Sequence, residues 1–312
     1  MTVSLIVTIL NEQKYILSLL NSFLSLSVKP DEIIIVDGGS TDQTVQLIKS
    51  WQKENKLKLV LLQKKGNRSV GRNLAISKAK NDWIAITDAG CTLQKEWLAQ
   101  LIWSSKGSDV VAGYYVGRFK TNFQQAVIPY ALVMPDRVDK NIFLPATRSM
   151  MIKKSVWQKI GGFDENLSDN EDYDFAIKIK KAGYKIKFAA KAMVEWIPRS
   201  NFLSFLKMIY RFAKGDTYAL IFRPKVLLIF VRYLLAILIT LGISLFSLKA
   251  AIALIVIGLI AYSLWAIKKN YLYVKDGWYF LPLLQIGSDL AVMMGSFLGL
   301  VQKGIDNLAH DI

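Results

Sequence analysis

The first 90 residues alternate between short apolar runs and segments whose apolar residues recur at helical spacing. The continuous apolar runs predict buried β-strands at 3–10, 32–36, 58–62 and 83–87. Between them we expect helices, the first of which begins at Asn11, a good N-cap. Strands that alternate with helices form right-handed βαβ units. The pattern therefore predicts an α/β fold in which flanking helices cover a mostly parallel sheet.

Three much longer apolar segments follow near the end of the chain: Val226–Leu248, Ala250–Ile267 and Trp278–Val301. Each has 18 to 24 residues, enough for a helix to cross roughly 30 Å of hydrocarbon. They predict an α-helical membrane region with about three spans. Basic residues precede the first span and separate the second from the third, so the positive-inside rule places the front of the chain in the cytoplasm and the short C-terminal tail outside.

A segment of mixed character, Asn201–Ile221, lies just before the first span. Its aromatic residues recur at helical spacing beside Lys207, Arg211 and Lys214, which favours a helix lying on the membrane surface, with an ordinary core-covering helix as the alternative. We therefore expect four regions: a catalytic-type domain at 1–200, an amphipathic interface helix region at 201–225, a transmembrane region at 226–301 and a short tail at 302–312.

The third apolar segment carries small residues at every fourth position, and these allow close contact with a helix of the same bundle or of a partner protein: Gly287, Ala291, Gly295 and Gly299. Asp289 lies off this stripe. A carboxylate inside a membrane is costly, so it indicates either a functional group or a pairing with a neighbouring helix or wet cavity.

Charge and hydrophobicity are segregated along the chain. The 312 residues include 40 basic and 24 acidic side chains, a net charge of +16, with a mean hydropathy of +0.29. Only six Lys/Arg and four Asp/Glu follow Val226, which leaves +14 on the first 225 residues. This front can attract anionic lipid surfaces and phosphorylated lipid carriers. Its basic residues are dispersed and no recognition motif accompanies them, so we expect no nucleic-acid partner.

The scarcity of cysteine and histidine excludes several kinds of catalytic and metal site. One cysteine, Cys91, excludes a disulfide within the chain, and the N-terminus lacks the features of a signal peptide. The only histidine is His310, near the C-terminus, so His-based triads and His-rich zinc sites are excluded from the front domain. No dinucleotide-binding or P-loop glycine motif is present. Catalysis there must use carboxylates, Arg or Lys, or a bound metal.

Suggestive polar residues follow the predicted strands, at the sheet edge where such folds bind ligands. They form part of six blocks: V-T-I-L-N-E (7–12), I-V-D-G-G-S-T-D (35–42), G-R-N-L-A (71–75), T-D-A-G (87–90), I-G-G-F-D-E (160–165) and N-E-D-Y-D-F (170–175). In this order and spacing the blocks closely resemble a family-2 glycosyltransferase of the GT-A fold, over about residues 1–200.

The resemblance implies an enzyme that inverts the anomeric carbon of a nucleotide sugar while transferring the sugar to an acceptor. It implies that Thr8 and Asp37 contact the nucleotide base, Glu12 the nucleoside end, and Arg72 the base or diphosphate region. Asp88 matches the first residue of the D-x-D motif. The pair Glu171-Asp172 matches the catalytic-base motif; we favour Asp172 as the base, with Glu171 as the alternative. Apart from the resemblance, two acids here also suit a helix N-terminus.

The sequence departs from the family pattern at the D-x-D motif, which ends in Gly90. Asp88 alone could hold a divalent cation (Mg²⁺ or Mn²⁺) through water and diphosphate oxygens, or basic side chains could replace the metal. Glu195 is a candidate substitute ligand where relatives often place a histidine. The Q-x-x-R-W signature of processive synthases is absent, which favours transfer of a single sugar.

From these residues we expect a membrane-anchored, inverting glycosyltransferase in the cell membrane, with its catalytic domain in the cytoplasm. It would move a sugar from a UDP- or GDP-sugar to a membrane lipid or lipid-linked saccharide in cell-envelope or polysaccharide assembly. The alternative is a non-catalytic nucleotide-sugar-binding membrane scaffold subunit, whose small-residue stripe (287–299) docks the true enzyme.

Overall fold

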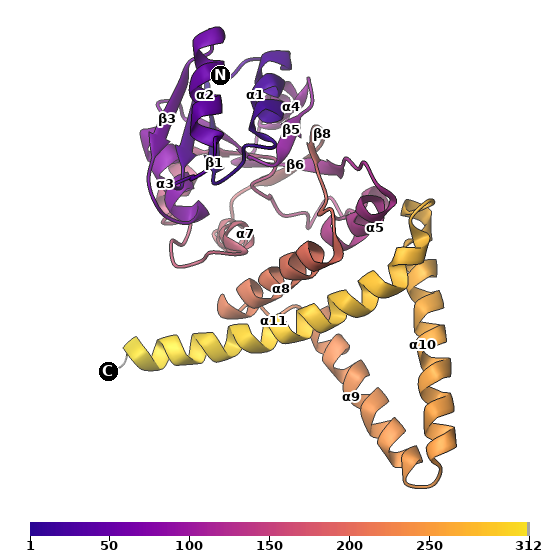
Figure 1. Ribbon diagram of the computed structural model, residues 1–312. Coiled ribbons are helices and arrows are strands. Elements are labelled where there is room, and N and C mark those ends of the chain that lie inside the picture. Colours follow the sequence, from indigo (N-terminus) through magenta and orange to yellow (C-terminus); the bar gives the residue numbers. More distant parts are fainter. Residues whose placement is uncertain (311–312) are drawn as a thin grey trace. The chain divides into compact units, whose positions relative to one another are not determined.

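The computed structural model describes residues 1–310, which fall into two compact units (Figure 1). The first unit combines Met1–Arg118 with Val133–Ile197, and the second combines Phe119–Leu132 with the chain from Pro198 onward. The six motif blocks all lie in the first unit, and the long apolar helices all lie in the second.

The first unit is built on one mixed sheet, which within the described residues has the strand order β3-β2-β1-β4-β7-β6-β8-β5. The strands are β1 (Val3–Ile9), β2 (Glu32–Asp37), β3 (Leu59–Gln63), β4 (Trp83–Asp88), β5 (Cys91–Leu93), β6 (Val110–Gly117), β7 (Met150–Lys153) and β8 (Ile186–Trp196). The first four pair in parallel, as does β6 with β8. The strand β7 runs antiparallel to β4 and β6, and β5 runs antiparallel to β8. The predicted mostly parallel α/β sheet is confirmed.

Helices cover the sheet and close its core: α1 (Ile16–Ser25), α2 (Thr44–Glu54), α3 (Arg68–Lys78), α4 (Trp97–Ser104), α6 (Lys154–Lys159) and α7 (Glu171–Lys181). The residues of β1, β2 and β4 are buried almost throughout, which is why each reads as a continuous apolar run rather than an alternating one. One core cluster joins these strands to Ala75 and Ile76 of α3 and to Phe175 and Ile179 of α7. The site-bearing helices α3 and α7 are thereby fixed to the sheet.

The expected start of the first helix at Asn11 is wrong. The helix α1 begins at Ile16, and Asn11 has a left-handed backbone with φ of 55°. Its side-chain oxygen accepts a hydrogen bond of 2.9 Å from the Thr41 amide. Asn11 therefore ties the end of β1 to the loop after β2, a tertiary role that a local capping rule does not anticipate.

The second unit contains α5 (Asn122–Ala131), α8 (Phe202–Tyr218), α9 (Pro224–Ser244), α10 (Leu248–Asn270) and α11 (Leu281–His310). Asn201 caps α8 through a hydrogen bond from the Ser204 amide. Three helical segments are long and apolar enough to cross a membrane: Pro224–Ser244, Leu248–Tyr273 and Trp278–Leu308. The last helix continues to His310, so the segment expected as a tail after residue 301 is helical over its described part.

The glycine stripe packs against α8 of the same chain. A Cβ at Gly287 would collide with Phe202 and Leu206, one at Gly295 with the Tyr210 carbonyl, and one at Gly299 with Lys214 and Thr217. Ala291, on the same face, is 9% exposed. Of the two alternatives expected for this stripe, the structure shows the contact with a helix of the same chain, which the small residues permit.

Candidate active site

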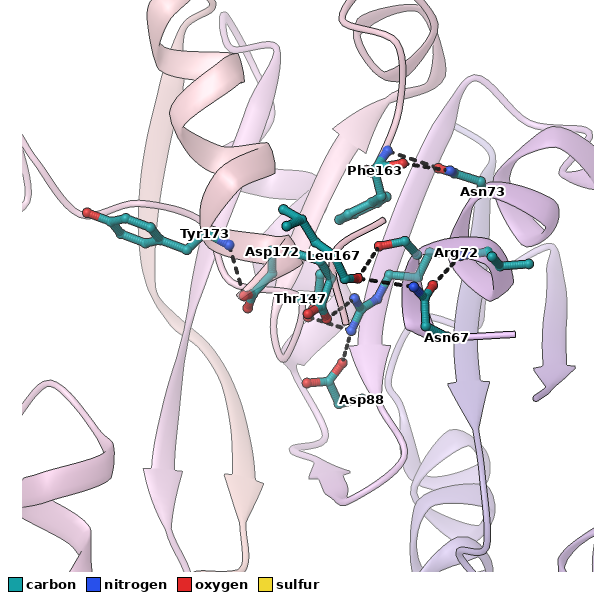
Figure 2. A network of polar contacts seen from close by, with 12 residues as sticks. Asn67, Arg72, Asn73, Asp88, Thr147, Phe163, Leu167, Asp172 and Tyr173 are labelled. Carbon is teal, nitrogen blue, oxygen red and sulfur yellow. Dashed lines mark hydrogen bonds and ion pairs between the residues drawn. The ribbon is translucent and has the colours of Figure 1, made fainter. Parts of the chain in front are cut away.

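The site is organised around the guanidinium of Arg72, which α3 carries into the interior with 2% of the side chain exposed. Its Nη1 donates to Glu171 Oε1 at 2.6 Å, and its Nη2 donates to Asp88 Oδ1 and Thr147 Oγ1, both at 2.9 Å. Figure 2 shows Asp88 and Thr147 beside the Arg72 guanidinium. Three segments that are far apart in sequence are thus held together by one side chain.

The neighbouring residues of α3 fix this arginine in place. Gly71 lies so close to β1 that a Cβ there would come within 2.8 Å of the Thr8 methyl group. Asn73 exchanges hydrogen bonds with the backbone of Phe163, its amide nitrogen donating at 2.8 Å and its oxygen accepting at 3.0 Å. The Phe163 ring lies 5.4 Å from the Arg72 guanidinium and stacks on Phe175. Gly71 and Asn73 therefore fix the position of α3 and with it the direction of the Arg72 side chain.

The turn before Phe163 explains the I-G-G-F block. Gly161 and Gly162 both have positive φ, 80° and 73°, and a Cβ at Gly162 would collide with Asn73 and Trp157. Phe163 itself is 2% exposed. The block therefore forms a tight turn that anchors Phe163 in the core.

The acidic pair opens α7, after Asn170 in a left-handed conformation with φ of 58°. Glu171 is buried, and among residues 1–310 its Oε2 has no hydrogen-bond partner. Asp172 is half-buried and accepts a hydrogen bond of 2.9 Å from the Tyr173 amide. Burial, and then the charge of Glu171, raise the pKa of Asp172, against the opposing pull of Arg72.

Asp88, at the end of β4, has the opposite electrostatics. Burial opposes its ionisation, but the charges of Arg72 and then Arg148 hold the pKa of Asp88 below its ordinary value. Its side chain is still 33% exposed. Burial alone would lower the pKa of Arg72, but the carboxylates of Asp88 and Glu171 raise it, so the buried guanidinium stays charged. The pKa of Asp88 is therefore lowered and that of Asp172 is raised, so Asp88 is ionised and Asp172 is the more basic carboxylate.

The remaining candidate residues lie at the ends of β1 and β2. Thr8 is opposite Asp88 in the sheet register, and Ile9 is opposite Asp37. Asp37 is fully buried, and its carboxylate accepts the Ser40 hydroxyl at 2.6 Å and the Ser40 amide at 3.1 Å. The Glu12 amide donates to the Thr44 hydroxyl at 2.8 Å. The sheet therefore brings these residues to the edge that also holds Asp88, and Asp37 shapes the loop that follows it.

Arg148 belongs to the same site but stands outside every sequence motif. Its carbonyl accepts a hydrogen bond of 2.9 Å from the Thr87 hydroxyl, which places it beside Asp88. Its guanidinium lies over two aromatic rings, 5.4 Å from the Tyr115 centroid and 5.1 Å from the Trp196 centroid. The arginine lowers the pKa of Asp88 and opposes the rise in that of Asp172. The sequence signal for it is a basic residue two positions before the buried strand β7.

The described residues do not fit a resident metal centre. Within residues 1–310 no cluster of three His, Cys, Asp or Glu side chains is placed to hold an ion. Asp88 is already paired with Arg72, and Gly90 supplies no second carboxylate. Glu195 pairs instead with Arg118 at 3.3 Å. Cys91 is buried, and burial raises the pKa of its thiol to about 12, so it is inert here.

The sequence of this chain matches the models of two known protein families. Residues 4–161 match the model of glycosyl transferase family 2, and residues 95–281 match that of glycosyl transferase family group 2. The chain belongs to glycosyltransferase family 2, an inverting family, and is an enzyme of that family.

Individual relatives come from bacterial polysaccharide synthesis. Succinoglycan biosynthesis protein ExoA of Rhizobium meliloti (strain 1021) is 26% identical over 228 residues, which are 68% of each chain. A poly-beta-1,6-N-acetyl-D-glucosamine synthase of Staphylococcus aureus (strain COL) is 24% identical over 216 residues, 66% of this chain and 52% of the synthase. The chain is thus related to polysaccharide synthases and spans about half of the latter.

Two solved structures share the fold. Mannosyltransferase PcManGT from Pyrobaculum calidifontis, in complex with GDP-Man and Mn²⁺, has a TM-score of 0.60 over 95% of this chain and 86% of that one, at 17% identity. S. aureus TarS 1–349 in complex with UDP-GlcNAc has a TM-score of 0.51 over 68% of this chain and 66% of that one, at 23% identity. Similarity at this level of identity establishes the shared fold alone.

Proposed function

We propose that the chain transfers a single sugar from a UDP- or GDP-sugar to the hydroxyl of a lipid-linked acceptor at the cytoplasmic face of the cell membrane. The observation that carries the proposal is the pair of aspartates beside Arg72, Asp88 and Asp172. Arg72 lowers the pKa of Asp88, whereas burial and the charge of Glu171 raise the pKa of Asp172. A nucleotide-sugar donor is supported by the complexes of the structural relatives with GDP-Man and UDP-GlcNAc.

In the proposed reaction the acceptor oxygen attacks the anomeric carbon from the face opposite the diphosphate. The C–O bond to the diphosphate breaks, and the proton of the acceptor hydroxyl passes to the Asp172 carboxylate. The raised pKa of Asp172 suits this role, because a base with a higher pKa drives proton transfer better near neutral pH. Glu171 suits it less, since its Oε1 is held by Arg72 and the side chain is buried.

The leaving nucleoside diphosphate carries away the bonding electrons and gains negative charge. We assign Arg148 to offset this charge, because its guanidinium lies over two aromatic rings beside Asp88 and is not used in a buried ion pair like that of Arg72. Arg72 then acts as a positioning residue, since its guanidinium donates to Glu171, Asp88 and Thr147 of the chain itself. Thr8, Glu12 and Asp37 are assigned to the nucleoside end of the donor.

An acceptor hydroxyl is favoured over an isoprenyl phosphate. A phosphate oxygen is already ionised near neutral pH and needs no base, whereas a sugar hydroxyl does. The front of the chain carries +14, which suits attraction to anionic lipid surfaces. The basic residues Arg223, Lys225, Lys268 and Lys269 flank the hairpin of α9 and α10 on its open side, which supports a cytoplasmic location for that side.

The test is a panel of UDP- and GDP-sugars incubated with membranes that contain the protein, with either polyprenyl phosphate or a lipid-linked saccharide as acceptor. We expect one donor to be consumed, with the saccharide acceptor, and an α-linked donor to give a β-linked product. Donors that bind without turnover on either acceptor would contradict the proposal and favour a scaffold role. Turnover on polyprenyl phosphate alone would overturn the hydroxyl acceptor.

A further inference from the structure

The helix α11 runs alongside α8 over nearly the whole length of α8, and in the same direction. Gly287 meets Phe202 near the start of α8, Gly295 meets Tyr210 in its middle, and Gly299 meets Lys214 and Thr217 near its end. Beyond the glycines, the Tyr218 hydroxyl donates to Asp306 at 2.9 Å. The two helices therefore form one rigid pair, and whatever environment holds α8 also holds α11 (Figure 1).

The charges of α8 exclude a membrane-spanning position for this pair. Lys207, Arg211, Lys214 and Asp216 fall within its 17 residues, and Lys207 and Arg211 lie on its exposed face. Each such charge costs about 2.5–3.5 kcal/mol at the centre of a bilayer on insertion scales. A helix with several of them lies at the interface, where the charged ends reach water. Because α11 is packed along α8, it is held there too.

The face of α11 turned away from α8 is apolar along its entire length. Its exposed residues recur at steps of three, four or seven: Leu283, Leu290, Met294, Phe297, Val301, Ile305 and Leu308. Each is between 42% and 67% exposed. Gln285, Ser288 and Ser296 of the same helix are buried, and its exposed polar residues, Gln302 and Asn307, lie only near its C-terminal end. An unpaired apolar stripe of this length matches a helix lying in the plane of the membrane.

The α9–α10 hairpin crosses α11 at a polar junction. Asp289 of α11 accepts hydrogen bonds from Arg232 at 2.9 Å and Tyr233 at 3.2 Å, both in α9, and from Tyr262 in α10. Twelve residues of α9 follow Arg232, a length of about 18 Å. For a hydrocarbon core about 30 Å thick, this leaves α11 about 12 Å below the near face of the core, slightly deeper than the roughly 5–10 Å range known for in-plane helices.

We infer that α11 does not cross the membrane but lies in the headgroup–acyl boundary, its apolar stripe in lipid, so that only the α9–α10 hairpin spans. The occupant of the stripe is the bilayer itself. Charge complementarity supports this choice, because Lys207, Arg211 and the basic residues at the open end of the hairpin suit an anionic lipid surface. The C-terminus then lies on the same side of the membrane as the catalytic domain, which replaces the outside location expected from the sequence.

Thiol labelling tests this topology independently of catalysis. In a Cys91→Ser background, single cysteines replace exposed residues in the catalytic domain, at the hairpin turn and near the C-terminus: Trp103, Phe246 and Asn307. Membrane-impermeant maleimide is applied to inside-out and right-side-out vesicles. We expect the thiols at 103 and 307 to react from one side and the thiol at 246 from the other. Labelling of 307 together with 246, or of all three from one side, would overturn the inference.

A depth measurement tests the occupant of the stripe. Phe297→Cys and its neighbour Ser296→Cys differ in that Phe297 is 63% exposed and Ser296 is 4% exposed. Each carries an environment-sensitive fluorophore in vesicles of phosphatidylcholine and phosphatidylglycerol that contain lipid nitroxides. We expect strong quenching at 297, and weak quenching at 296, by nitroxides near the headgroups. Strongest quenching at 297 by nitroxides at the bilayer centre indicates a span, and no quenching indicates a protein partner; both outcomes overturn the inference.

Discussion

Removing the guanidinium of Arg72 is expected to destabilise the catalytic domain more than any other single loss of a charged side chain at the site. In Arg72→Met, the Glu171 carboxylate stays buried without its 2.6 Å partner, and Asp88 and Thr147 lose theirs. Breaking a buried ion pair on one side costs about 3–5 kcal/mol. Asp88 is 33% exposed and can be solvated, so we expect Glu171 to account for most of this cost.

This cost converts to a measurable shift in melting temperature. For a domain of this size, each kcal/mol lowers Tm by about 2–4 °C, so Arg72→Met should lower it by roughly 10 °C. Differential scanning fluorimetry of the purified full chain measures the shift. The matched control is Arg118→Met, whose pair with Glu195 at 3.3 Å is largely accessible, with 57% of the arginine and 31% of the glutamate side chain exposed. Exposed pairs contribute about 0–1 kcal/mol, so Tm of the control should change by only a few degrees.

A second substitution separates the buried charge from lost packing. If the cost comes from the unpaired Glu171, neutralising it in Arg72→Met/Glu171→Gln should recover part of the lost Tm, because the amide carries no charge to desolvate. The reasoning is refuted if Arg72→Met melts no lower than Arg118→Met. It is also refuted if the double variant melts no higher than Arg72→Met.

Three further predictions concern the reacting groups. Arg148→Gln should lower kcat by about 10²-fold or more with a smaller change in donor KM, because its charge acts on the departing diphosphate; an unchanged kcat in steady-state assays would remove it from the reaction. Gly90→Asp should tighten Mn²⁺ binding in the presence of UDP or GDP by about tenfold or more, because a Cβ at Gly90 meets no atom within 4 Å and the new carboxylate can join Asp88. Equal affinities of the two chains in calorimetry would count against this. Because burial and Glu171 raise the pKa of Asp172, and the base must be ionised, kcat/KM should rise with pH through an apparent pKa above the usual aspartate value; a profile already flat at that usual value would disagree.

Much of the fold could be predicted because the central strands are buried on both faces. The strands β1, β2 and β4 therefore appear in the sequence as uninterrupted apolar runs. The three-residue strand β5 has no such pattern, since its place is fixed by antiparallel pairing with β8, about 100 residues later. The start of α1 was misplaced for a similar reason, because Asn11 bonds to a distant loop.

The site was partly predictable for a different reason. The motif blocks identified Asp88, Glu171 and Asp172, and the structure brings all three to one cluster around Arg72. The partners of Arg72 are tertiary contacts that no spacing rule reveals. Arg148 was missed because it stands outside every motif block and acquires its setting from two rings on different strands.

In the membrane region, too, the sequence pattern does not reveal which distant segments pack together. The spacing of Gly287, Gly295 and Gly299 predicted a close helix contact, but periodicity cannot say which helix approaches. The contact with the charged helix α8 changes the interpretation of α11, because it ties an apolar segment to a helix that carries four charges. Hydropathy alone would count α11 as a third span.

The central claim is that Asp172 is the base of a sugar transfer, and a comparison of binding with turnover tests it most directly. Donor affinity by calorimetry and sugar transfer to the acceptor are measured for the natural chain, Asp172→Asn and Asp174→Asn. The control Asp174 lies in the same turn of α7 but pairs with Lys178 at 2.7 Å. We predict that Asp172→Asn loses at least about 10²-fold in kcat and keeps its donor affinity, while Asp174→Asn keeps both. An Asp172→Asn variant that still transfers sugar at the natural rate would contradict the account.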